Sequence, residues 1–539
     1  MKVKNKLKDT LFMEKIRNIY YILATPFTKH ISLFLILFVL LGFNDIYRYI
    51  TIYNAPTYSV YLALKGFLLS YVITFILSLL PSLVRKMVSI LFVVFFAIYF
   101  AVEFYCIDYL GVPFDADFAT MIFTTNTNEA SEFFQSMVPF SFIIKLSLLV
   151  ISVILCCYVG EKIVKKLIAL PMIAILVVAV LGSIHNTSIW DSTIFEKVYN
   201  IAKYEVPSDL RVYFTHPKME KSPNSPQNIV VIMGESFSRH HSSIYGYEKN
   251  TNPLLSKLVE DSSLIVFNNA TSAGLSTMIS FKYMMSGYGP DSKDDKEWNE
   301  YPLLLDVVES AGYNTHWFSN HANVGVNNNV TRLLAFACKD NHFTDDNISG
   351  DFSTTYDELL IDIAKPYIAQ FDKNKYNFYF FHLLGSHFKF DLRYPKDFAV
   401  FSEKDYLNNL EHQRFTLASY DNSILYNDKV VYDIIQLFKD KDAIVVYLAD
   451  HGLDIYNTSD NYAAHGKIND PISAKYGSEI PFFIYPTELY KQNNPDVVSE
   501  LKESRNQSIR TDSLMNIIMN IAKIRYKEDV VVKNKKTTD

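Results

Sequence analysis

The sequence is poor in the residues that would crosslink a secreted domain. Only four of its 539 residues are cysteine, and only Cys338 lies beyond residue 160. A disulfide within the C-terminal part of the chain is therefore excluded, so that part must be held together by noncovalent packing. This composition permits an oxidising compartment but does not indicate one.

The sequence also lacks a long basic run. Its 51 Lys and Arg residues are outnumbered by 57 Asp and Glu residues, which gives a formal net charge of −6 at pH 7. Nucleic-acid binding as the main activity would require a concentrated positive surface. We therefore expect no nucleic-acid partner, although net charge alone does not identify the substrate.

Long apolar runs are abundant, but only before about residue 185. Five of them approach the length of a bilayer crossing and are predicted as transmembrane helices centred on residues 31–48, 60–81, 87–105, 138–159 and 167–184. A chain of 539 residues should hold two or three folding units. We predict a five-helix transmembrane bundle over 1–185, a linker with interfacial helices over 186–227, an α/β domain over 228–527 and a polar tail over 528–539.

The charged residues around these runs predict their orientation. Seven Lys or Arg residues precede the first run, against Asp9 and Glu14, so the positive-inside rule places the N-terminus in the cytoplasm. The short turns after the second and fourth runs are also basic, whereas the loop over 108–132 is acidic and contains no Lys or Arg. Five crossings that begin inside must end outside, so the C-terminal domain is expected outside the cytoplasm.

Three charged residues fall within the apolar runs, namely Lys65, Glu103 and Lys145. We interpret them as groups near helix ends whose charged atoms reach the membrane interface. A role in a proton or substrate path is the alternative interpretation. The sequence does not pair these residues with one another.

Beyond residue 228, short β-rich runs alternate with helical patterns. Six runs are predicted as strands, over residues 228–233, 264–267, 314–318, 377–382, 443–448 and 480–485. This alternation is typical of a mainly parallel sheet with helices on both faces. Ligands of such sheets bind beyond the carboxyl ends of the strands.

Carboxylate and imidazole residues follow three of the predicted strands. Glu235 follows the first strand, His382 and His387 lie at the end of the fourth, and Asp450 with His451 follows the fifth. Oxygen and nitrogen ligands at one sheet edge suit a zinc ion. Taken alone, Glu235 could be a loop carboxylate and His451 could hydrogen-bond a loop. Their joint arrangement favours a metal site, and the glycine after His451 would permit close backbone approach.

Residues 229–236 (IVVIMGES) and 245–253 (YGYEKNTNP) form a pattern that is long enough to be specific. This pattern resembles the opening of the catalytic domain in the phosphoethanolamine transferases of the alkaline phosphatase superfamily. Five membrane spans and the loop over 124–132 extend the similarity to nearly the whole chain. Further matches follow in the family's order: 269–277 (NATSAGLST), 317–320 (WFSN), 385–387 (GSH), 449–452 (ADHG), 464–466 (AHG) and 510–513 (RTDS).

The resemblance implies roles for individual residues. The family nucleophile is a threonine, which the match places at Thr277 rather than at Ser276 or Ser280. A helix-capping hydroxyl is the alternative role of Thr277, and the two roles are compatible because a helix N-terminus attracts phosphate. The implied set comprises Glu235, Thr277, Asp450 and His451 as ligands of the principal zinc ion, and His387 and His465 near the transferred phosphate or a second zinc ion. Asn320 is a further candidate for the cleft, whereas His382 and His321 are interpreted mainly as structural or surface histidines that could face the cleft.

The resemblance also implies a fold and a reaction. We expect an alkaline-phosphatase-like domain in the periplasm, anchored in a bacterial inner membrane. The donor would be phosphatidylethanolamine, whose phosphoethanolamine group would pass through Thr277 to an envelope glycolipid, either lipid A or a lipopolysaccharide core sugar. The alternative is a phosphoglycerol transferase that uses phosphatidylglycerol, and a non-catalytic membrane sensor is a more distant one.

Two departures from the family pattern are informative. Ala273 and Tyr283 stand where many members have cysteines, so packing must hold the nucleophile loop instead of disulfides. Residues 319–323 (SNHAN) stand where the branch that modifies lipid A has a lysine. In this respect the chain is closer to the branch that modifies core sugars.

Overall fold

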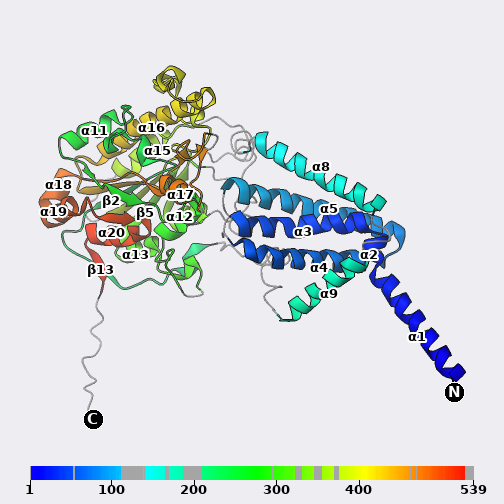
Figure 1. Cartoon of the computed structure of the whole chain (residues 1–539). Coiled ribbons are helices and arrows are strands. Elements are labelled where there is room, and N and C mark those ends of the chain that lie inside the picture. Colours follow the sequence, from blue (N-terminus) through cyan, green and yellow to red (C-terminus); the bar gives the residue numbers. More distant parts are fainter. Residues whose placement is uncertain are drawn as a thin grey trace, which may run out of the picture. The chain divides into compact units, whose positions relative to one another are not determined.

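The computed structural model describes residues 2–51, 55–110, 114, 138, 140–163, 169–185, 209–293, 296–321, 330–344, 355–369, 375–460, 463–468 and 470–527. The chain divides into two compact units, one with helices α1 to α9 and one with the elements from Leu210 onward (Figure 1). The loop over 124–132, the linker residues 186–208 and the tail over 528–539 lie outside the described residues.

The described part of the N-terminal unit is helical. Four helices are long and apolar enough to cross a membrane, and they coincide with the first four predicted spans. The fifth prediction coincides with α9 (Ala169–His185), an apolar helix of 17 residues that is shorter than the other four. The four long helices are α3 (Ile31–Thr51), α4 (Ser59–Ser78), α5 (Ser82–Tyr105) and α8 (Phe140–Ile163), and α1 (Lys2–Leu23) with α2 (Thr25–Thr28) precedes them.

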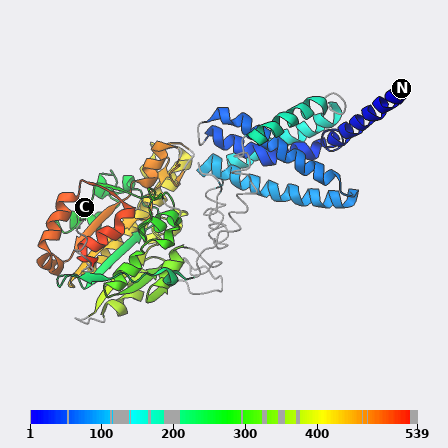
Figure 2. The ribbon, with the colours of Figure 1, turned by 90° about the horizontal axis from the view of Figure 1, so that it is seen from below.

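Helices α3, α4 and α5 pack side by side, as both views show (Figures 1 and 2). A very close approach lies between Gly42 of α3 and Gly66 of α4, where a Cβ atom added to Gly66 would lie 2.8 Å from the Cα of Gly42. Membrane helices associate through such small residues because their backbones can then make extensive van der Waals contact. A larger side chain at Gly66 would therefore push α3 and α4 apart.

The C-terminal unit contains a seven-stranded sheet with the strand order β3-β11-β8-β2-β7-β5-β6. All six predicted strands are present, and β6 is an additional strand at one edge. The sheet is mixed, because β11 runs antiparallel to both β8 and β3 whereas the other neighbouring pairs are parallel. The strands are β2 (Asn228–Gly234), β3 (Ile265–Val266), β5 (Tyr313–Ser319), β6 (Asp340–Phe343), β7 (Tyr376–His382), β8 (Ala443–Ala449) and β11 (Phe482–Pro486).

Helices cover both faces of this sheet. Figure 1 shows α11 (Pro253–Glu260) and α16 (Glu411–Phe438) on one face, and α13 (Leu304–Ser310) and α20 (Leu514–Ile521) on the other. All residues of β2 and β8 are consequently buried. Burial on both faces explains why these two strands read as continuous apolar runs in the sequence.

The register of the central strands brings three chain segments to one edge. Met233 of β2 pairs with His382 of β7, and Gly234 of β2 pairs with Ala449 of β8. These three parallel strands therefore end at the same level. The residues that follow them must lie close together, as expected for a ligand site of an α/β sheet.

Four charged side chains are buried where α3, α4 and α5 meet. Arg48 lies 2.7 Å from Asp45 and 3.4 Å from Glu103, while Lys65 lies 3.3 Å from Asp45. The interpretation of Lys65 and Glu103 as interfacial groups is therefore wrong, because each pairs with a residue of α3 inside the bundle. Lys145, in contrast, is half exposed.

Replacing Asp45 with Asn should destabilise the N-terminal unit, because Glu103 would remain as the one carboxylate of this cluster facing two buried cations. Removing one partner of a buried ion pair typically costs about 3 kcal/mol. We expect a lower melting temperature for Asp45→Asn in detergent and no change for Glu14→Gln, a matched substitution of an exposed carboxylate in α1. Equal stability of Asp45→Asn and the parent would contradict this expectation.

Candidate metal centre

Four candidate residues are delivered to the shared sheet edge by three elements. Glu235 directly follows β2, and Asp450 and His451 directly follow β8. Thr277 is the first residue of helix α12 (Thr277–Met284), whose cap residue, Ser276, makes no capping hydrogen bond with its side chain. Thr277 therefore follows the cap residue in the chain, and its hydroxyl is directed toward the carboxylate of Glu235.

The donor atoms of these residues converge. The Thr277 Oγ1 atom lies 3.2 Å from Glu235 Oε2 and 3.4 Å from His451 Nε2. The same His451 Nε2 atom lies 3.3 Å from Asp450 Oδ2 and 3.5 Å from Glu235 Oε1. Glu235, Asp450 and His451 are each at most 1% exposed. Two carboxylates, an imidazole and a hydroxyl thus surround one point in the protein interior.

The hydrogen bonds around the cluster leave one lone-pair atom of Asp450 and one of His451 directed into the cluster. Asp450 Oδ1 accepts the backbone N–H groups of Ser236, at 3.0 Å, and His451, at 2.7 Å. Among the described residues, the buried Asp450 Oδ2 atom has no hydrogen-bond partner. His451 Nδ1 lies 2.9 Å from the Gly452 carbonyl oxygen, so Nδ1 donates and the lone pair is on Nε2. Such outer contacts orient ligands toward a metal ion.

The electrostatics of the cluster also indicate a cation. Burial, and after it the nearby negative charge of Asp450, raises the pKa of Glu235 well above its ordinary value. Two carboxylates buried side by side are costly in the ionised form. A divalent cation would offset both charges, and a donor set of two carboxylates, one imidazole and one hydroxyl suits zinc. The residues present therefore fit a zinc ion.

Two glycines allow the backbone to pass close to the cluster. A Cβ atom on Gly452 would lie 2.6 Å from the Tyr476 carbonyl oxygen, which confirms the predicted close approach after His451. Gly385 has a φ of +50°, and a Cβ atom there would lie 2.8 Å from the backbone nitrogen of Glu235. Any side chain at either position would displace a neighbour of the candidate metal ligands.

The loop that carries Thr277 is attached by hydrogen bonds. The Ser272 hydroxyl donates to the backbone carbonyl of Asp450, and the backbone N–H of Ala273 donates to Thr511 Oγ1 at 2.9 Å. Thr511 belongs to the segment over 510–513 that resembles the family. One of these contacts is made by Ala273, which stands at one of the two positions where many members of that family have cysteines.

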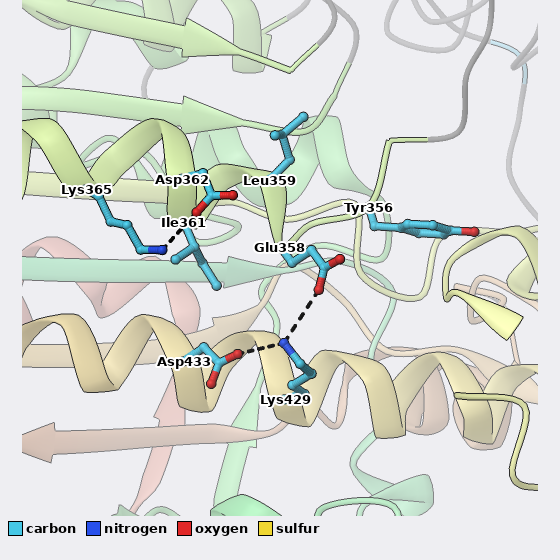
Figure 3. Close-up of a pocket in the computed structure, with 8 residues that line it drawn as sticks. All are labelled: Tyr356, Glu358, Leu359, Ile361, Asp362, Lys365, Lys429 and Asp433. Carbon is cyan, nitrogen blue, oxygen red and sulfur yellow. Dashed lines mark hydrogen bonds and ion pairs between the residues drawn. The ribbon is translucent and has the colours of Figure 1, made fainter. Parts of the chain in front are cut away.

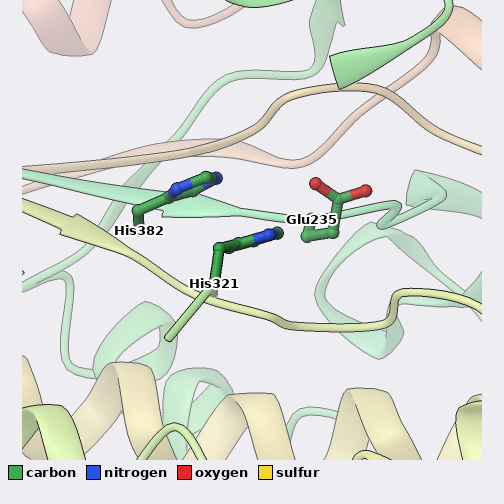
Figure 4. Close-up of side chains that lie close together, drawn as sticks. All are labelled: Glu235, His321 and His382. Atoms are coloured by element: carbon green, nitrogen blue, oxygen red, sulfur yellow. The ribbon is translucent and has the colours of Figure 1, made fainter. Parts of the chain in front are cut away.

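The predicted histidines fall into two places around the cluster. The His465 ring lies 4.5 Å from the ring of His451, whereas the ring of His387 lies 6.3 Å from that of His321. His382, at the end of β7, is 1% exposed and stacks on His321, which follows β5. Glu235, His321 and His382 form a second group whose ligand atoms lie within 4.8 Å of one another (Figure 4).

Asn320 is buried in a separate hydrogen-bond network. Its side-chain amide donates to Asp357 Oδ1 at 2.8 Å and to the Thr355 carbonyl at 3.1 Å. Asp357 in turn accepts the backbone N–H groups of Leu384, at 2.8 Å, and Gly385, at 2.9 Å. Asn320 thus supports the loop after β7, behind the metal ligands.

Asp357 of this region was not singled out by the sequence analysis, whereas His321 was interpreted mainly as a structural histidine that could face the cleft. His321 follows β5, the neighbour of β7, so its position after a strand was a usable signal. Asp357 has no such signal, because its carboxylate oxygens accept hydrogen bonds from the loop after β7, which is distant from Asp357 in the sequence. Folding alone brings Asp357 to this loop.

A surface pocket elsewhere in the domain has no part in the cluster (Figure 3). Its charged side chains neutralise one another, since Lys429 Nζ lies 3.5 Å from Glu358 and 2.7 Å from Asp433. None of the candidate site residues lines it. The pocket is formed by Tyr356, Glu358, Leu359, Ile361, Asp362, Lys365, Lys429 and Asp433.

Comparisons with known proteins agree with this arrangement. The sulfatase family profile matches residues 227–524, which is more than half of the chain. Phosphoethanolamine transferase EptC of Escherichia coli is 27% identical over 288 residues, covering 51% of this chain and 48% of the relative. Phosphoethanolamine transferase EptA of Helicobacter pylori is 28% identical over 378 residues, covering 66% and 68%. The chain spans about half the length of the first curated relatives it matches.

Two solved structures share the fold. The zinc complex of the C-terminal periplasmic domain of Escherichia coli EptC has a TM-score of 0.50 and 23% identity, covering 57% of this chain and 86% of that chain. The integral membrane lipooligosaccharide phosphoethanolamine transferase A of Neisseria meningitidis has a TM-score of 0.61 and 16% identity, covering 93% and 96%. The architecture of apolar helices followed by a sulfatase-like α/β domain is therefore a known one.

Metal-free protein should lose stability on mild acidification. Burial lowers the pKa of His465 to about 3 and lowers the pKa values of His382 and His387 well below the ordinary 6.5. A histidine whose pKa is lowered by folding stabilises the protein fully above pH 6.5, and this contribution is lost as pH falls toward the lowered value. We expect chelator-treated protein to melt at a lower temperature at pH 5 than at pH 7.5, as followed by tryptophan fluorescence.

The variant His465→Gln should show a shallower fall over the same pH range, because it removes one of these groups. His412→Gln, which replaces an exposed histidine, is the matched control and should follow the parent. A parallel pH dependence of His465→Gln and the parent would contradict the assignment.

Proposed function

Because the chain belongs to the sulfatase family through residues 227–524, we propose that it is a zinc-dependent membrane enzyme that transfers phosphoethanolamine from phosphatidylethanolamine to an envelope glycolipid. The observation that carries this proposal is the position of the Thr277 hydroxyl, 3.2 Å from Glu235 and 3.4 Å from His451. The names of the relatives, which are phosphoethanolamine transferases, supply the identity of the transferred group.

Glu235, Thr277, Asp450 and His451 would hold the zinc ion. When bound, zinc would favour ionisation of the Thr277 hydroxyl and offset negative charge on the phosphate oxygens. Glu235 orients the hydroxyl through their hydrogen bond, and Asp450 is itself held by two backbone N–H groups. Thr277 is thereby presented as a nucleophile from a fixed position at the start of α12.

The transfer takes two displacement steps. Thr277 Oγ1 gives up its proton and attacks the phosphorus of phosphatidylethanolamine, the bond from phosphorus to the glycerol oxygen breaks, and that proton passes to the glycerol oxygen as diacylglycerol leaves. A hydroxyl of the acceptor then attacks the same phosphorus, and the bond to Thr277 breaks. His387 or His465, both neutral because burial lowers their pKa values, accepts the proton of the attacking hydroxyl.

The acceptor in this proposal is lipid A or a lipopolysaccharide core sugar. A structural neighbour is named a lipooligosaccharide phosphoethanolamine transferase, which supports a glycolipid of this class. The segment 319–323, which lacks the lysine of the lipid A branch, supports a core sugar. Donor and acceptor both lie at the membrane, so an anchored enzyme meets them at a high effective concentration.

The proposed topology has five spans, with the N-terminus in the cytoplasm and the catalytic domain in the periplasm of a bacterial inner membrane. Four crossings would leave both ends on one side, so α9 must form the fifth crossing. The domain limits in this proposal are 1–185 for the bundle, 186–227 for a linker, 228–527 for the catalytic domain and 528–539 for the tail. The acidic loop over 108–132 would then be periplasmic.

Incubation of the purified enzyme with headgroup-labelled phosphatidylethanolamine should place one phosphoethanolamine on Thr277. Intact-protein mass spectrometry followed by peptide mapping measures this adduct. Thr277→Ala and chelator treatment should each abolish it, because one removes the nucleophile and the other removes the metal. Thr277→Ser retains the hydroxyl and should form the adduct.

The same experiment with labelled phosphatidylglycerol serves as the donor control. An adduct from phosphatidylglycerol and none from phosphatidylethanolamine would replace the proposal with a phosphoglycerol transferase. A folded, zinc-loaded protein that forms an adduct with neither lipid would support a non-catalytic role.

Single exposed cysteines test the topology. Lys86→Cys, near the start of α5, should be protected from a membrane-impermeant maleimide in intact cells, whereas Lys404→Cys in the catalytic domain should be labelled. The unmodified chain is the background control. Equal labelling of both variants in intact cells would contradict an odd number of crossings.

A further inference from the structure

Helix α1 differs from the apolar helices that follow it. Its 22 residues include six Lys or Arg residues and two acidic ones, whereas the whole chain carries a formal net charge of −6. Among the described helices, α1 is not one of the four that are long and apolar enough to cross a membrane. Because Lys and Arg are costly in the bilayer interior, the charged part of α1 must lie outside the hydrocarbon region.

The C-terminal half of α1 carries a stripe of large apolar side chains, which we call its apolar face. Phe12, Ile16, Ile19 and Leu23 follow one another at intervals of four, three and four residues, so they share one side of the helix. Each of the four is between 38% and 64% exposed. Figures 1 and 2 show α1, in dark blue, extending away from the other helices of its unit, which leaves this face uncovered.

The opposite side of the same half is polar. Glu14, Arg17 and Asn18 lie there at the helical spacing, and all three are exposed. The first eight residues of the chain contain four further Lys residues. A basic helix with one apolar and one polar face is typical of segments that lie in the plane of a membrane surface.

The bundle holds the C-terminal end of α1 at the level where the first span begins. The Tyr71 hydroxyl of α4 donates a hydrogen bond of 3.0 Å to the Leu23 carbonyl oxygen. Phe27 of α2 is 1% exposed, and its ring lies 5.1 Å from the ring of Phe34 in α3. Because α3 begins at Ile31, the apolar face of α1 begins within reach of the membrane surface.

A proline separates α1 from the helix that follows. α1 ends at Leu23, and α2 begins at Thr25 with Pro26 in its first turn. Proline has no backbone N–H, so the helical hydrogen bond to the Ile22 carbonyl cannot form. The change of direction that lets α1 lie along the membrane can therefore occur at this break.

The end of the bundle beside this break is also basic. Burial, and after it the charges of Arg85 and Lys29, lowers the pKa of His30. Both charges therefore lie near His30, which stands directly before α3. Positive charge thus continues from α1 onto the same end of the bundle, and a surface of this sign attracts anionic lipid headgroups.

We propose that α1 lies along the surface of a membrane that contains anionic phospholipid, with its apolar face in the boundary between headgroups and acyl chains. A second copy of α1 could also cover this face, but two helices with the same excess of positive charge repel each other. The lipid surface instead offers an apolar layer and negative charge together, which match the two sides of α1. This inference is independent of the proposed transferase reaction.

Fluorescence of the full-length protein in lipid vesicles tests this proposal. The environment-sensitive dye NBD is attached to one added cysteine, either Ile16→Cys on the apolar face or Asn18→Cys on the polar side. The vesicles contain phosphatidylcholine with or without phosphatidylglycerol, and the labelled parent chain, with its four native cysteines, gives the background. Both leaflets have the same lipids, so the orientation of the protein in the vesicle does not affect the result.

We expect blue-shifted emission from the dye at residue 16 in vesicles that contain phosphatidylglycerol. Lipids with spin labels on their acyl chains should quench this emission. The dye at residue 18 should keep the emission of a water-exposed group and resist quenching, because it faces away from the membrane. High salt, or vesicles without phosphatidylglycerol, should weaken the shift at residue 16, since part of the attraction is between charges.

Charge variants test the role of the anionic lipid. Lys15→Gln combined with Arg17→Gln, in the chain labelled at residue 16, should reduce the shift in phosphatidylglycerol vesicles toward the value in pure phosphatidylcholine. Lys396→Gln combined with Lys404→Gln is the matched control. It removes two exposed Lys residues from the C-terminal α/β domain and should leave the shift unchanged.

Four outcomes would overturn the proposal. Water-like emission at residue 16 in phosphatidylglycerol vesicles would show that the apolar face does not enter the membrane. Equal quenching at residues 16 and 18 would show that α1 is immersed in the bilayer. An equal shift in both kinds of vesicle would remove the role of anionic lipid. A blue shift that resists the spin-labelled lipids and grows with the ratio of protein to lipid would assign the apolar face to a second copy of the chain.

Discussion

The buried carboxylate of Glu235 sets the requirements that the C-terminal α/β domain around it must meet. It contacts the Thr277 hydroxyl and lies 3.5 Å from His451, and the negative charge of Asp450 helps to raise its pKa. The glycine at 385 and the hydrogen bonds of Ser272 are arranged so that the backbone can approach this group. A buried anionic cluster of this kind is stable when positive charge is brought to it.

The two units of the chain solve the same electrostatic problem in different ways. In the helical unit, Asp45 and Glu103 are buried together with Arg48 and Lys65, so the protein supplies its own positive charge. In the C-terminal α/β domain, the carboxylates of Glu235 and Asp450 face imidazoles and a hydroxyl. The first arrangement is suited to holding helices in register, whereas the second is suited to binding a metal ion.

Much of the architecture could be predicted from the sequence, because buried segments have a periodic or continuous pattern of apolar residues. The four long membrane helices and all six predicted strands are present where the apolar runs indicated. The short strand β6 (Asp340–Phe343) and the antiparallel direction of β11 were not readable. Strand direction depends on the path of the connecting chain, which composition does not record. The pairing of Lys65 with Asp45 could not be predicted either, because the two residues lie on different helices and only helix packing brings them together.

The sequence by itself determined which residue types are available at the ends of the strands, and the motif around Thr277 identified the nucleophile candidate. The tertiary structure decided which of these residues share a site. The parallel register of β2, β7 and β8 brings Glu235, Asp450 and His451 to one point, and stacking adds His321 to His382. Distances across strands depend on pairing between segments that are distant in the sequence, so no local pattern could have specified them.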